Sequence, residues 1–443
     1  MTAPPATTRE ILASRTLDHV VVIGANGTMG FGSAALFTQA VPRVTFLART
    51  KDKAQAGLDA AVKQVRSSSL ASRADVGDYD NDLPEVLKTA DLVFEAVAED
   101  MDLKKQIFDK IEANRRDDSI VATVSSGLSI NELSAGRSDS FRRNFCGLHF
   151  FNPPNVITGT ELIANADTDP GVLDFLEVFC RIRLGREMVR TADTPAFAGN
   201  RVGFKVLNEA AQLAETYSPL VVDAIVGPYT GRALTPLATI DLVGWDVHRA
   251  IVDNVYDLTN DEAHETLKLP NYMAKLIDNG VLGNKTGSGF FKRDGKTTLV
   301  LDVATGDYVD PSTIEMPDLS YVNEVADLYA QGRYEEGLTI LLDAPGEAAE
   351  IARKIMAGYI SYSFERVGEV CDSINDIDRI MGMGFNWAPP SVLVDFIGAK
   401  RTAAMLASAG VVVPAAISEA AASSDPAPFS QNLSNPGRYF VAA

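Results

Sequence analysis

Short runs of apolar residues alternate with amphipathic stretches over roughly the first 190 residues. The runs are rich in β-branched side chains and almost free of polar ones, as in strands that a parallel sheet buries on both faces. We predict such strands at 20–23, 44–48, 91–97, 119–124 and 145–151, with another at 161–164. Residues 99–112 repeat their apolar side chains every three or four positions, which predicts a helix packed on the sheet. The alternation predicts an α/β fold with a Rossmann-type, doubly wound sheet, whose ligands bind beyond the carboxyl ends of its strands.

The pattern changes at Asp193, Thr194 and Pro195. A polar residue followed by a proline is typical of a helix start, so we predict a long helix from here to about Tyr217. The chain beyond it is mainly helical. The exception is residues 296–309, where two β-rich runs flank a turn that contains glycine and predict a hairpin.

Two segments of the helical part resemble each other. Thr-Pro-Leu-Ala-Thr-Ile-Asp-Leu-Val-Gly, which contains Asp241, corresponds to Pro-Pro-Ser-Val-Leu-Val-Asp-Phe-Ile-Gly, which contains Asp395. Upstream, the segment around Asp223 corresponds to the one around Asp378 at nearly the same separation. A repeat of this kind indicates two copies of one helical domain. We therefore expect a sheet domain at 1–192, a helical substrate or dimerisation-type domain at 193–310, a connector at 311–345 and a second helical copy at 346–443.

A glycine-rich loop follows the first predicted strand, and an alanine-rich helix is predicted from Ser33. Glycines between a strand and a helix let backbone N–H groups approach a phosphate at the helix N-terminus. The spacing G-x-x-G-x-x-G, from Gly24 to Gly30, is one residue longer than the usual dinucleotide fingerprint. Any tight strand-to-helix turn can use glycine, but the order of strand, loop and helix favours a nucleotide site.

Basic residues gather after the second predicted strand of a strongly acidic protein. The net charge is −19, which argues against nucleic acid and against anionic membrane surfaces as partners. Six basic residues nevertheless lie between 49 and 73, namely Arg49, Lys51, Lys53, Lys63, Arg66 and Arg73. Such an excess suggests attraction of a polyanionic ligand, although a solvated helix face would have the same composition.

The composition otherwise describes an ordinary globular protein. Of 443 residues, 46% are hydrophobic and 22% charged. No apolar run approaches the roughly 18 residues of a membrane helix, and residues 1–15 contain no apolar signal core. Cys146, Cys180 and Cys371 lie in apolar surroundings, as small core residues of a reducing compartment do. With four histidines and no Cys/His cluster we expect no metal site, and we expect a cytoplasmic protein.

His149 is the candidate for acid–base chemistry. It lies near the end of a buried strand that Asn152, Pro153 and Pro154 close, and Glu161 follows twelve positions later on the next strand. Two adjacent strands can bring an imidazole and a carboxylate into contact, which fixes the ring tautomer and stabilises the protonated ring. A buried histidine satisfied by a backbone carbonyl is the alternative.

Together these segments resemble the L-3-hydroxyacyl-CoA dehydrogenase family, in collinear order from about residue 20 to 300. The residues from 311 to 443 resemble the second helical copy of longer, multifunctional members, and no part resembles the hydratase domain that those members often carry. The matching pieces are the loop ending Met29-Gly30, Phe94-Glu-Ala-Val-Ala-Glu99, Ser125-Ser-Gly-Leu-Ser-Ile130, His149-Phe-Phe-Asn-Pro153 with Glu161, Asp193-Thr-Pro-Ala-Phe-Ala-Gly-Asn-Arg201, Ile240-Asp-Leu-Val-Gly244 and Leu282-Gly-Asn-Lys-Thr-Gly-Ser-Gly-Phe290.

The resemblance implies catalytic roles. His149 would take the proton of the substrate's C3 hydroxyl while hydride leaves for the nicotinamide, and Glu161 would orient His149 and balance its charge. Ser126 and Asn200 would hydrogen-bond the hydroxyl or the thioester carbonyl. The residues expected to bind the dinucleotide are Gly24, Asn26, Gly27, Thr28, Met29, Gly30 and Arg49, and, by the resemblance, Glu99, Lys104, Asn152 and Lys285.

Three positions depart from the family pattern. The glycine loop has an extra residue around Asn26, and Ala196 stands where the family usually has glycine. Ala48 stands where NAD-specific members place an aspartate on the ribose hydroxyls, and Arg49 follows it. An arginine there can pair with a 2′-phosphate, so we expect an NAD(P) enzyme that prefers NADP, with NAD as the alternative.

The function expected is that of a 3-hydroxyacyl-CoA dehydrogenase of fatty acid metabolism. The alternatives are a dehydrogenase of a free hydroxy acid, of the carnitine or sugar-acid type, and a catalytically silent nucleotide-binding homologue. The expected partner is an acyl-CoA substrate, with no nucleic acid and no membrane. The chain would be a monomer whose two helical copies form an internal pseudo-dimer, or a homodimer through another surface.

Overall fold

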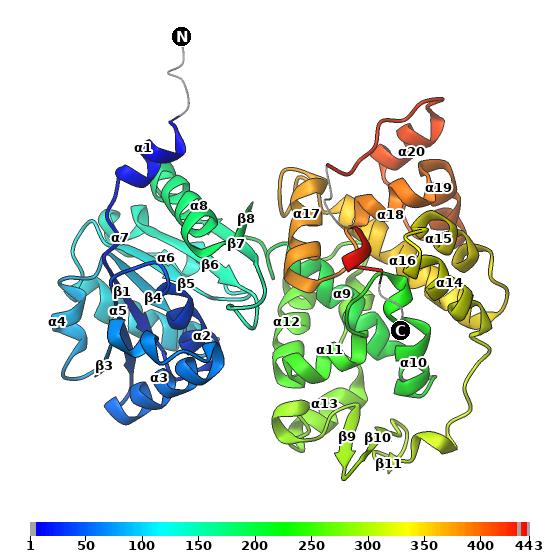
Figure 1. The fold of residues 1–443 in the computed structure, drawn as a ribbon, viewed down its shortest axis with the longest axis horizontal. Helices are drawn as coiled ribbons and strands as arrows, with labels where there is room; N and C mark the ends of the chain where they lie inside the picture. The colour runs from blue at the N-terminus through cyan, green and yellow to red at the C-terminus, as the bar shows by residue number, and fades with distance from the viewer. Residues whose placement is uncertain (1–5, 432–435, 441–443) are drawn as a thin grey trace. The chain divides into compact units, whose positions relative to one another are not determined.

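A computed structural model describes residues 6–431 and 436–440. The chain divides into two compact units, Met1–Phe197 and Ala198–Ala443 (Figure 1). The first unit contains a sheet covered by helices, and the second is mainly helical. We describe each unit separately.

An eight-stranded sheet of order β3-β2-β1-β4-β5-β6-β7-β8 forms the centre of the first unit. The six strands from β3 to β6 in this order run parallel, whereas β7 is antiparallel to β6 and parallel to β8. The predicted α/β class and Rossmann-type sheet are therefore confirmed, with the direction reversed at β7. The strands are β1 (His19–Ile23), β2 (Arg43–Ala48), β3 (Ala74–Asp78), β4 (Leu92–Glu95), β5 (Ile120–Thr123), β6 (Phe145–Phe150), β7 (Gly159–Ala164) and β8 (Glu187–Thr191).

Helices bury both faces of this sheet. The helices on one face are α1 (Thr8–Ala13), α2 (Thr28–Phe37), α3 (Lys51–Val65) and α8 (Pro170–Leu184). Those on the other face are α4 (Leu83–Leu87), α5 (Met101–Asn114), α6 (Ile130–Ser134) and α7 (Asp139–Arg143). A short 3₁₀ helix, η1 (Ser68–Arg73), follows α3.

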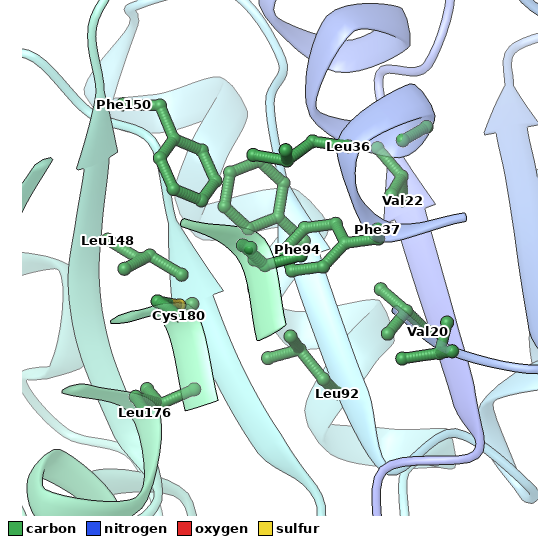
Figure 2. Close-up of a cluster of buried hydrophobic side chains, with 14 of the residues drawn as sticks. Val20, Val22, Leu36, Phe37, Leu92, Phe94, Leu148, Phe150, Leu176 and Cys180 are labelled. Atoms are coloured by element: carbon green, nitrogen blue, oxygen red, sulfur yellow. The ribbon is translucent and has the colours of Figure 1, made fainter. Parts of the chain in front are cut away.

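Three phenylalanine rings anchor the first face of the sheet. Phe94 of β4 lies between Phe37 of α2 and Phe150 of β6, with ring centroids 5.3 and 5.5 Å apart (Figure 2). All three rings are buried, so this contact ties α2 to the centre of the sheet. The contact restrains the glycine loop before α2 and the end of β6.

Two predicted helix starts are wrong. Helix α2 begins at Thr28, not Ser33, because the loop turns directly into the helix at Gly27, its N-cap. Helix α9 begins at Gly199, not near Pro195. Ala196 and Phe197 have φ of +62° and +54°, and a left-handed backbone cannot continue into a right-handed helix. Asp193 instead caps α6, with its carboxylate 2.8 Å from the N–H groups of Ile130 and Asn131.

The second unit consists mainly of helices. The hairpin predicted at 296–309 is present as β10 and β11, and a further strand, β9, pairs with β10. The strands are β9 (Phe291–Asp294), β10 (Thr297–Leu301) and β11 (Tyr308–Val309). The α-helices are α9 (Gly199–Leu213), α10 (Pro219–Ile225), α11 (Pro236–Val243), α12 (Trp245–Leu258), α13 (Asn271–Asp278), α14 (Ser320–Ala330), α15 (Tyr334–Asp343), α16 (Glu347–Glu365), α17 (Ile374–Ile380), α18 (Pro390–Ile397), α19 (Ala399–Ser408) and α20 (Ala415–Ala422).

The sequence repeat is matched by repeated contacts. Asp223 of α10 accepts hydrogen bonds at the start of α11, from the N–H of Leu237 at 2.8 Å, and Asp378 of α17 accepts one at the start of α18, from Ser391 at 3.1 Å. Burial raises the pKa of Asp223 to about 6 and that of Asp378 to about 7. The same type of carboxylate thus holds the same helix junction twice.

A second pair of aspartates repeats in the same way. Asp241 of α11 accepts from the N–H groups of Phe290 and Phe291, both at 2.9 Å. Asp395 of α18 accepts from those of residues 429 and 430, at 2.9 and 2.8 Å. Each copy therefore ties its helix to a later segment of chain through one carboxylate. The segments that the sequence repeat pairs therefore share the same type of carboxylate contact.

A buried polar network joins α9 and α16 inside the second unit. The Nε of Arg201 on α9 donates to the hydroxyl of Tyr362 on α16 at 2.6 Å, and that hydroxyl donates to Asp261 at 2.8 Å. Arg201 and Asp261 also form an ion pair at 2.7 Å. Arg201 is 1% exposed and Tyr362 2%, so water cannot replace these bonds when a partner is lost.

Replacing Tyr362 by phenylalanine should therefore destabilise the second unit. The substitution removes the hydroxyl that accepts a hydrogen bond from Arg201 and donates one to Asp261. Each of these two charged groups then has one partner fewer. We expect the free energy of unfolding to fall by about 1–3 kcal/mol, measured by urea denaturation. Tyr217→Phe is the matched control, because the bond from Tyr217 to Glu347 is exposed. Equal stability of both variants would contradict the expectation.

Candidate active site

His149 and Glu161 lie opposite each other on adjacent strands. They are register partners in the antiparallel pair of β6 and β7, and opposite residues of such a pair point to the same face. The Nδ1 of His149 is 2.7 Å from the Oε2 of Glu161, and the two side chains are 4% and 0% exposed. A carboxylate accepts from Nδ1–H, which fixes the tautomer and leaves Nε2 as the basic nitrogen. The predicted contact is confirmed, and the backbone-carbonyl alternative is wrong.

Aromatic rings surround the imidazole. The ring centroid of Phe151 lies 4.8 Å from that of His149, and the centroid of Phe197 lies 5.8 Å away. Phe197 reaches this position through the left-handed turn that includes Ala196, φ +62°. A non-glycine residue in this conformation costs about 1–2 kcal/mol. The alanine that departs from the family pattern therefore keeps the glycine-type backbone, at the expense of strain.

Ser126 lies in a loop directly after β5, and Glu99 holds that loop. The Oε1 of Glu99 accepts from the N–H groups of Ser126 at 2.8 Å and Gly127 at 3.2 Å, and from the hydroxyl of Ser125 at 2.6 Å. Burial opposes the charge of Glu99, but the Lys104 ammonium and these hydrogen bonds outweigh it and lower the pKa of the carboxyl. The charge of His149 acts on Glu99 in the same direction, so Ser126 and His149 share this neighbour.

Lys104 lies behind Glu99 in the protein interior. Its side chain is 0% exposed, and its Nζ is 2.9 Å from Glu95 and 3.4 Å from Glu99. Burial acts against the charge, but the two carboxylates raise the pKa of the ammonium. Glu95 is not among the site residues predicted from the sequence. The signal was available, because a glutamate that ends a short buried strand requires a partner.

The glycine loop suits the pyrophosphate of a dinucleotide, which backbone N–H groups bind. A Cβ on Gly30 would lie 2.1 Å from the carbonyl oxygen of Gly24, and one on Gly24, φ +83°, would lie 2.4 Å from that of Ala96. No side chain caps the N-terminus of α2 at Gly27, so its first N–H groups can meet a phosphate. Asn26, Gly27 and Thr28 are exposed there, as such contacts require.

The end of β2 carries the ribose-side candidates. Ala48 is buried, whereas Arg49 is exposed and directly follows it. The register partner of Ala48 on β3 is Asp78. The carboxylate of Asp78 accepts hydrogen bonds from residues 80 and 81 of its own turn, at 3.1 and 2.7 Å for the two N–H groups.

The remaining candidate site residues belong to different units of the chain. Asn152 follows β6 in the first unit and is exposed. Asn200 and Lys285 belong to the second unit: Asn200 is 5% exposed in the first turn of α9, and Lys285 forms an ion pair with Asp246. The contact of each with a substrate or dinucleotide stays a prediction.

Models of two domains of one protein family match this chain. Residues 19–194 match the NAD binding domain of 3-hydroxyacyl-CoA dehydrogenase, and residues 197–293 match its C-terminal domain. The "Probable 3-hydroxyacyl-CoA dehydrogenase" of Deinococcus radiodurans is 34% identical over 291 residues, which make up 62% of this chain and 83% of that protein. The chain belongs to the 3-hydroxyacyl-CoA dehydrogenase family. As a family member with the NAD binding domain, it takes a nicotinamide dinucleotide as cofactor.

Other relatives agree with this assignment. The "Probable 3-hydroxyacyl-CoA dehydrogenase" of Bacillus subtilis is 34% identical over 347 residues, 77% of this chain, and the chain spans 43% of its length. The (S)-3-hydroxybutyryl-CoA dehydrogenase of Ralstonia eutropha has a similar structure, with a TM-score of 0.54, 26% identity and coverage of 62% of this chain and 98% of that chain. The 3-hydroxybutyryl-CoA dehydrogenase of Escherichia coli has the same fold over 89% of this chain and 94% of its own, with a TM-score of 0.67 and 21% identity.

Within 6–431 and 436–440, no group of three or more His, Cys, Asp or Glu side chains is placed to hold a metal ion. No described helix is long and apolar enough to cross a membrane. Cys146, Cys180 and Cys371 are buried thiols, and the prediction that they are core residues is confirmed.

Proposed function

We propose that this family member catalyses reversible hydride transfer between a (S)-3-hydroxyacyl-CoA and a nicotinamide dinucleotide, giving the 3-ketoacyl-CoA. The observation that carries the proposal is the buried hydrogen bond of 2.7 Å between His149 and Glu161. A carboxylate beside a buried imidazole fixes the ring in one tautomer and balances the charge of the imidazolium that forms during the reaction. A silent nucleotide-binding homologue has no use for this pair.

Each candidate residue has its own role in the proposed reaction. His149 takes the proton of the C3 hydroxyl at Nε2, and Glu161 holds the ring and stabilises its protonated form. Ser126 and Asn200 hydrogen-bond the substrate oxygens, so that the developing carbonyl stays oriented. The glycine loop and the N-terminus of α2 would hold the pyrophosphate of the dinucleotide, which would supply the acceptor for the hydride that leaves C3.

The thioester substrate is proposed over a free hydroxy acid on grounds of charge. The basic residues between 49 and 73 contribute positive charge near the sheet domain of an acidic protein, and CoA carries three phosphate groups. Initial rates on short- and long-chain 3-ketoacyl-CoAs, compared with free 3-keto acids, distinguish the two substrate classes. We place the enzyme in fatty acid metabolism in the cytoplasm, a reducing compartment that suits its buried thiols.

Removing either member of the acid–base pair should stop turnover. We expect His149→Ala to lower kcat by about 10²–10⁴-fold, and Glu161→Gln to have a comparable effect, because the ring loses its orientation and its charge partner. Dinucleotide affinity, measured by fluorescence titration, should stay within a few-fold of the unmodified protein. A near-normal kcat in either variant would refute the catalytic assignment.

We propose that the enzyme prefers NADP(H). Ala48 offers no carboxylate to accept from a ribose 2′-hydroxyl or to repel a 2′-phosphate, and the exposed Arg49 beside it can form a charge-assisted contact with that phosphate. Asp78 lies on the neighbouring strand, but hydrogen bonds within its own turn engage its carboxylate. The alternative is that Arg49 stacks on the adenine or binds CoA phosphates, with NAD(H) as the better cofactor.

Arg49→Ala should therefore raise KM for NADPH much more than KM for NADH. Lys53→Ala is the matched control: it removes one exposed positive charge from the nearby start of α3 and should change both values little. Initial rates over a range of each cofactor give the comparison. A higher kcat/KM with NADH in the unmodified protein would overturn the preference.

We propose that residues 193–310 and 346–443 act as a built-in pair. The network of Arg201, Asp261 and Tyr362 lies between them. This internal contact takes the place of the contact that single-copy relatives make by dimerising. The chain would then bind one dinucleotide and act as a monomer, or as a homodimer through another surface.

Ending the chain after residue 310 tests this arrangement. The exposed face of the first copy should then cause aggregation or new dimerisation, because it loses the buried partners that α16 supplies. Light scattering and gel filtration measure the result, with the full chain as the control. A soluble, fully active monomer would contradict the proposal.

A further inference from the structure

A closed ring of hydrogen bonds and ion pairs lies at the carboxyl ends of β4 and β5. It begins at Glu95, whose carboxylate is 0% exposed. The hydroxyl of Thr123 donates to Oε2 of Glu95 at 2.6 Å, and the N–H of Val97 donates to Oε1 at 2.6 Å. On its other side Glu95 holds Lys104, with Nζ at 3.0 and 2.9 Å from its two oxygens.

The ring continues through Lys104 to the loop after β5. The Lys104 ammonium is 3.4 Å from Oε2 of Glu99. The other oxygen of Glu99 accepts from the Ser125 hydroxyl at 2.6 Å, and the N–H of Ser125 donates to the Thr123 hydroxyl at 3.2 Å. This last bond closes the ring.

Four members of the ring are completely buried, and only Glu99 reaches the surface, with its side chain 36% exposed. Buried charges stay in place only when each has its partners. Each member therefore fixes the next, and the geometry of the interior is transmitted to Glu99. The backbone of Ser126 depends on that carboxylate through its N–H, at 2.8 Å.

We propose that Glu95, Lys104 and Thr123 are positioning residues, which set the place of Ser126 through Glu99 and Ser125. This rests on the role of Ser126 in the proposed function. Thr123 is the member best suited to a test, because its hydroxyl both donates to Glu95 and accepts from Ser125 and so lies at the closing bond. Replacing a charged member would leave an unpaired buried charge and disturb the fold as a whole.

The experiment compares Thr123→Val with Thr123→Ser in the full chain. Valine keeps the shape and removes the hydroxyl, whereas serine keeps the hydroxyl and removes the methyl. We expect valine to lower kcat on a short-chain 3-ketoacyl-CoA about 10- to 100-fold, since a small misplacement of a substrate-binding group has an effect of that size. Serine should restore kcat to within about 2-fold. Ser126→Ala and the double variant Thr123→Val/Ser126→Ala complete a double-mutant cycle.

If the ring acts through Ser126, the losses of kcat in Thr123→Val and Ser126→Ala should not add in the double variant. The double variant should then be no slower than the slower single variant, whereas additive losses would mean that Thr123 acts by another route and would overturn the proposal. Should Thr123→Val fail to fold, Ser125→Ala breaks the ring on the other side of the closing bond and enters the same cycle.

Amide hydrogen exchange of the loop tests the proposal without a measurement of enzyme activity. The N–H groups of residues 125–127 should exchange faster in Thr123→Val than in Thr123→Ser, while those of β5 stay unchanged. Equal exchange in the two variants would refute the proposal. If Ser126→Ala keeps full kcat, the role of Ser126 in the proposed function is wrong, and the exchange comparison alone decides whether the ring positions the loop.

Discussion

The hydrogen bond between His149 and Glu161 depends on a change of direction in the sheet. The strands up to β6 run parallel, and β7 returns antiparallel beside β6. Antiparallel register places two residues directly opposite each other, so one glutamate meets one histidine at 2.7 Å, and both side chains are buried. A slip of β7 by one residue would turn the side chain of Glu161 to the opposite face of the sheet, away from His149. The packing of the sheet, which includes the rings of Phe37, Phe94 and Phe150, therefore maintains the strand register on which the His149–Glu161 contact depends (Figure 2).

Charged side chains, two of them completely buried, lie together at the carboxyl edge of this sheet. Glu95, Lys104 and Glu99 form a chain of alternating sign from a fully buried carboxylate to a partly exposed one. Burial of this kind is tolerated because each charge is paired and hydrogen-bonded. The exposed end of the chain holds the loop of Ser126 and lies within the electrostatic reach of His149. Fold stability and the geometry of the candidate site thus share the same residues.

The second unit uses aspartates for a comparable purpose. Asp223 and Asp378 each hold the start of a following helix, and Asp241 and Asp395 each hold a later segment of chain. A carboxylate can accept several N–H groups at once, so one residue fixes a junction that would otherwise need a longer hydrophobic contact. The repetition of these bonds explains why the aspartates stand out in the sequence repeat, where the apolar residues around them vary.

Local pattern in the sequence determined much of this protein. Apolar runs of the right length located six of the eight strands of the first unit, all but β3 and β8, and the segment around His149 with Glu161 indicated both the family and the acid–base pair, because apolar runs and side-chain alternation are local properties. Tertiary structure decided the rest. The turn at Ala196 and Phe197 moves the start of the predicted helix from Pro195 to Gly199, since a left-handed backbone cannot continue into a right-handed helix, and Phe197 in this turn packs against the His149 ring. Glu95 acquired its partners from β5 and α5, segments that only the folded sheet brings together. A buried charge is visible in a sequence, but the groups that neutralise it are set by contacts between distant segments.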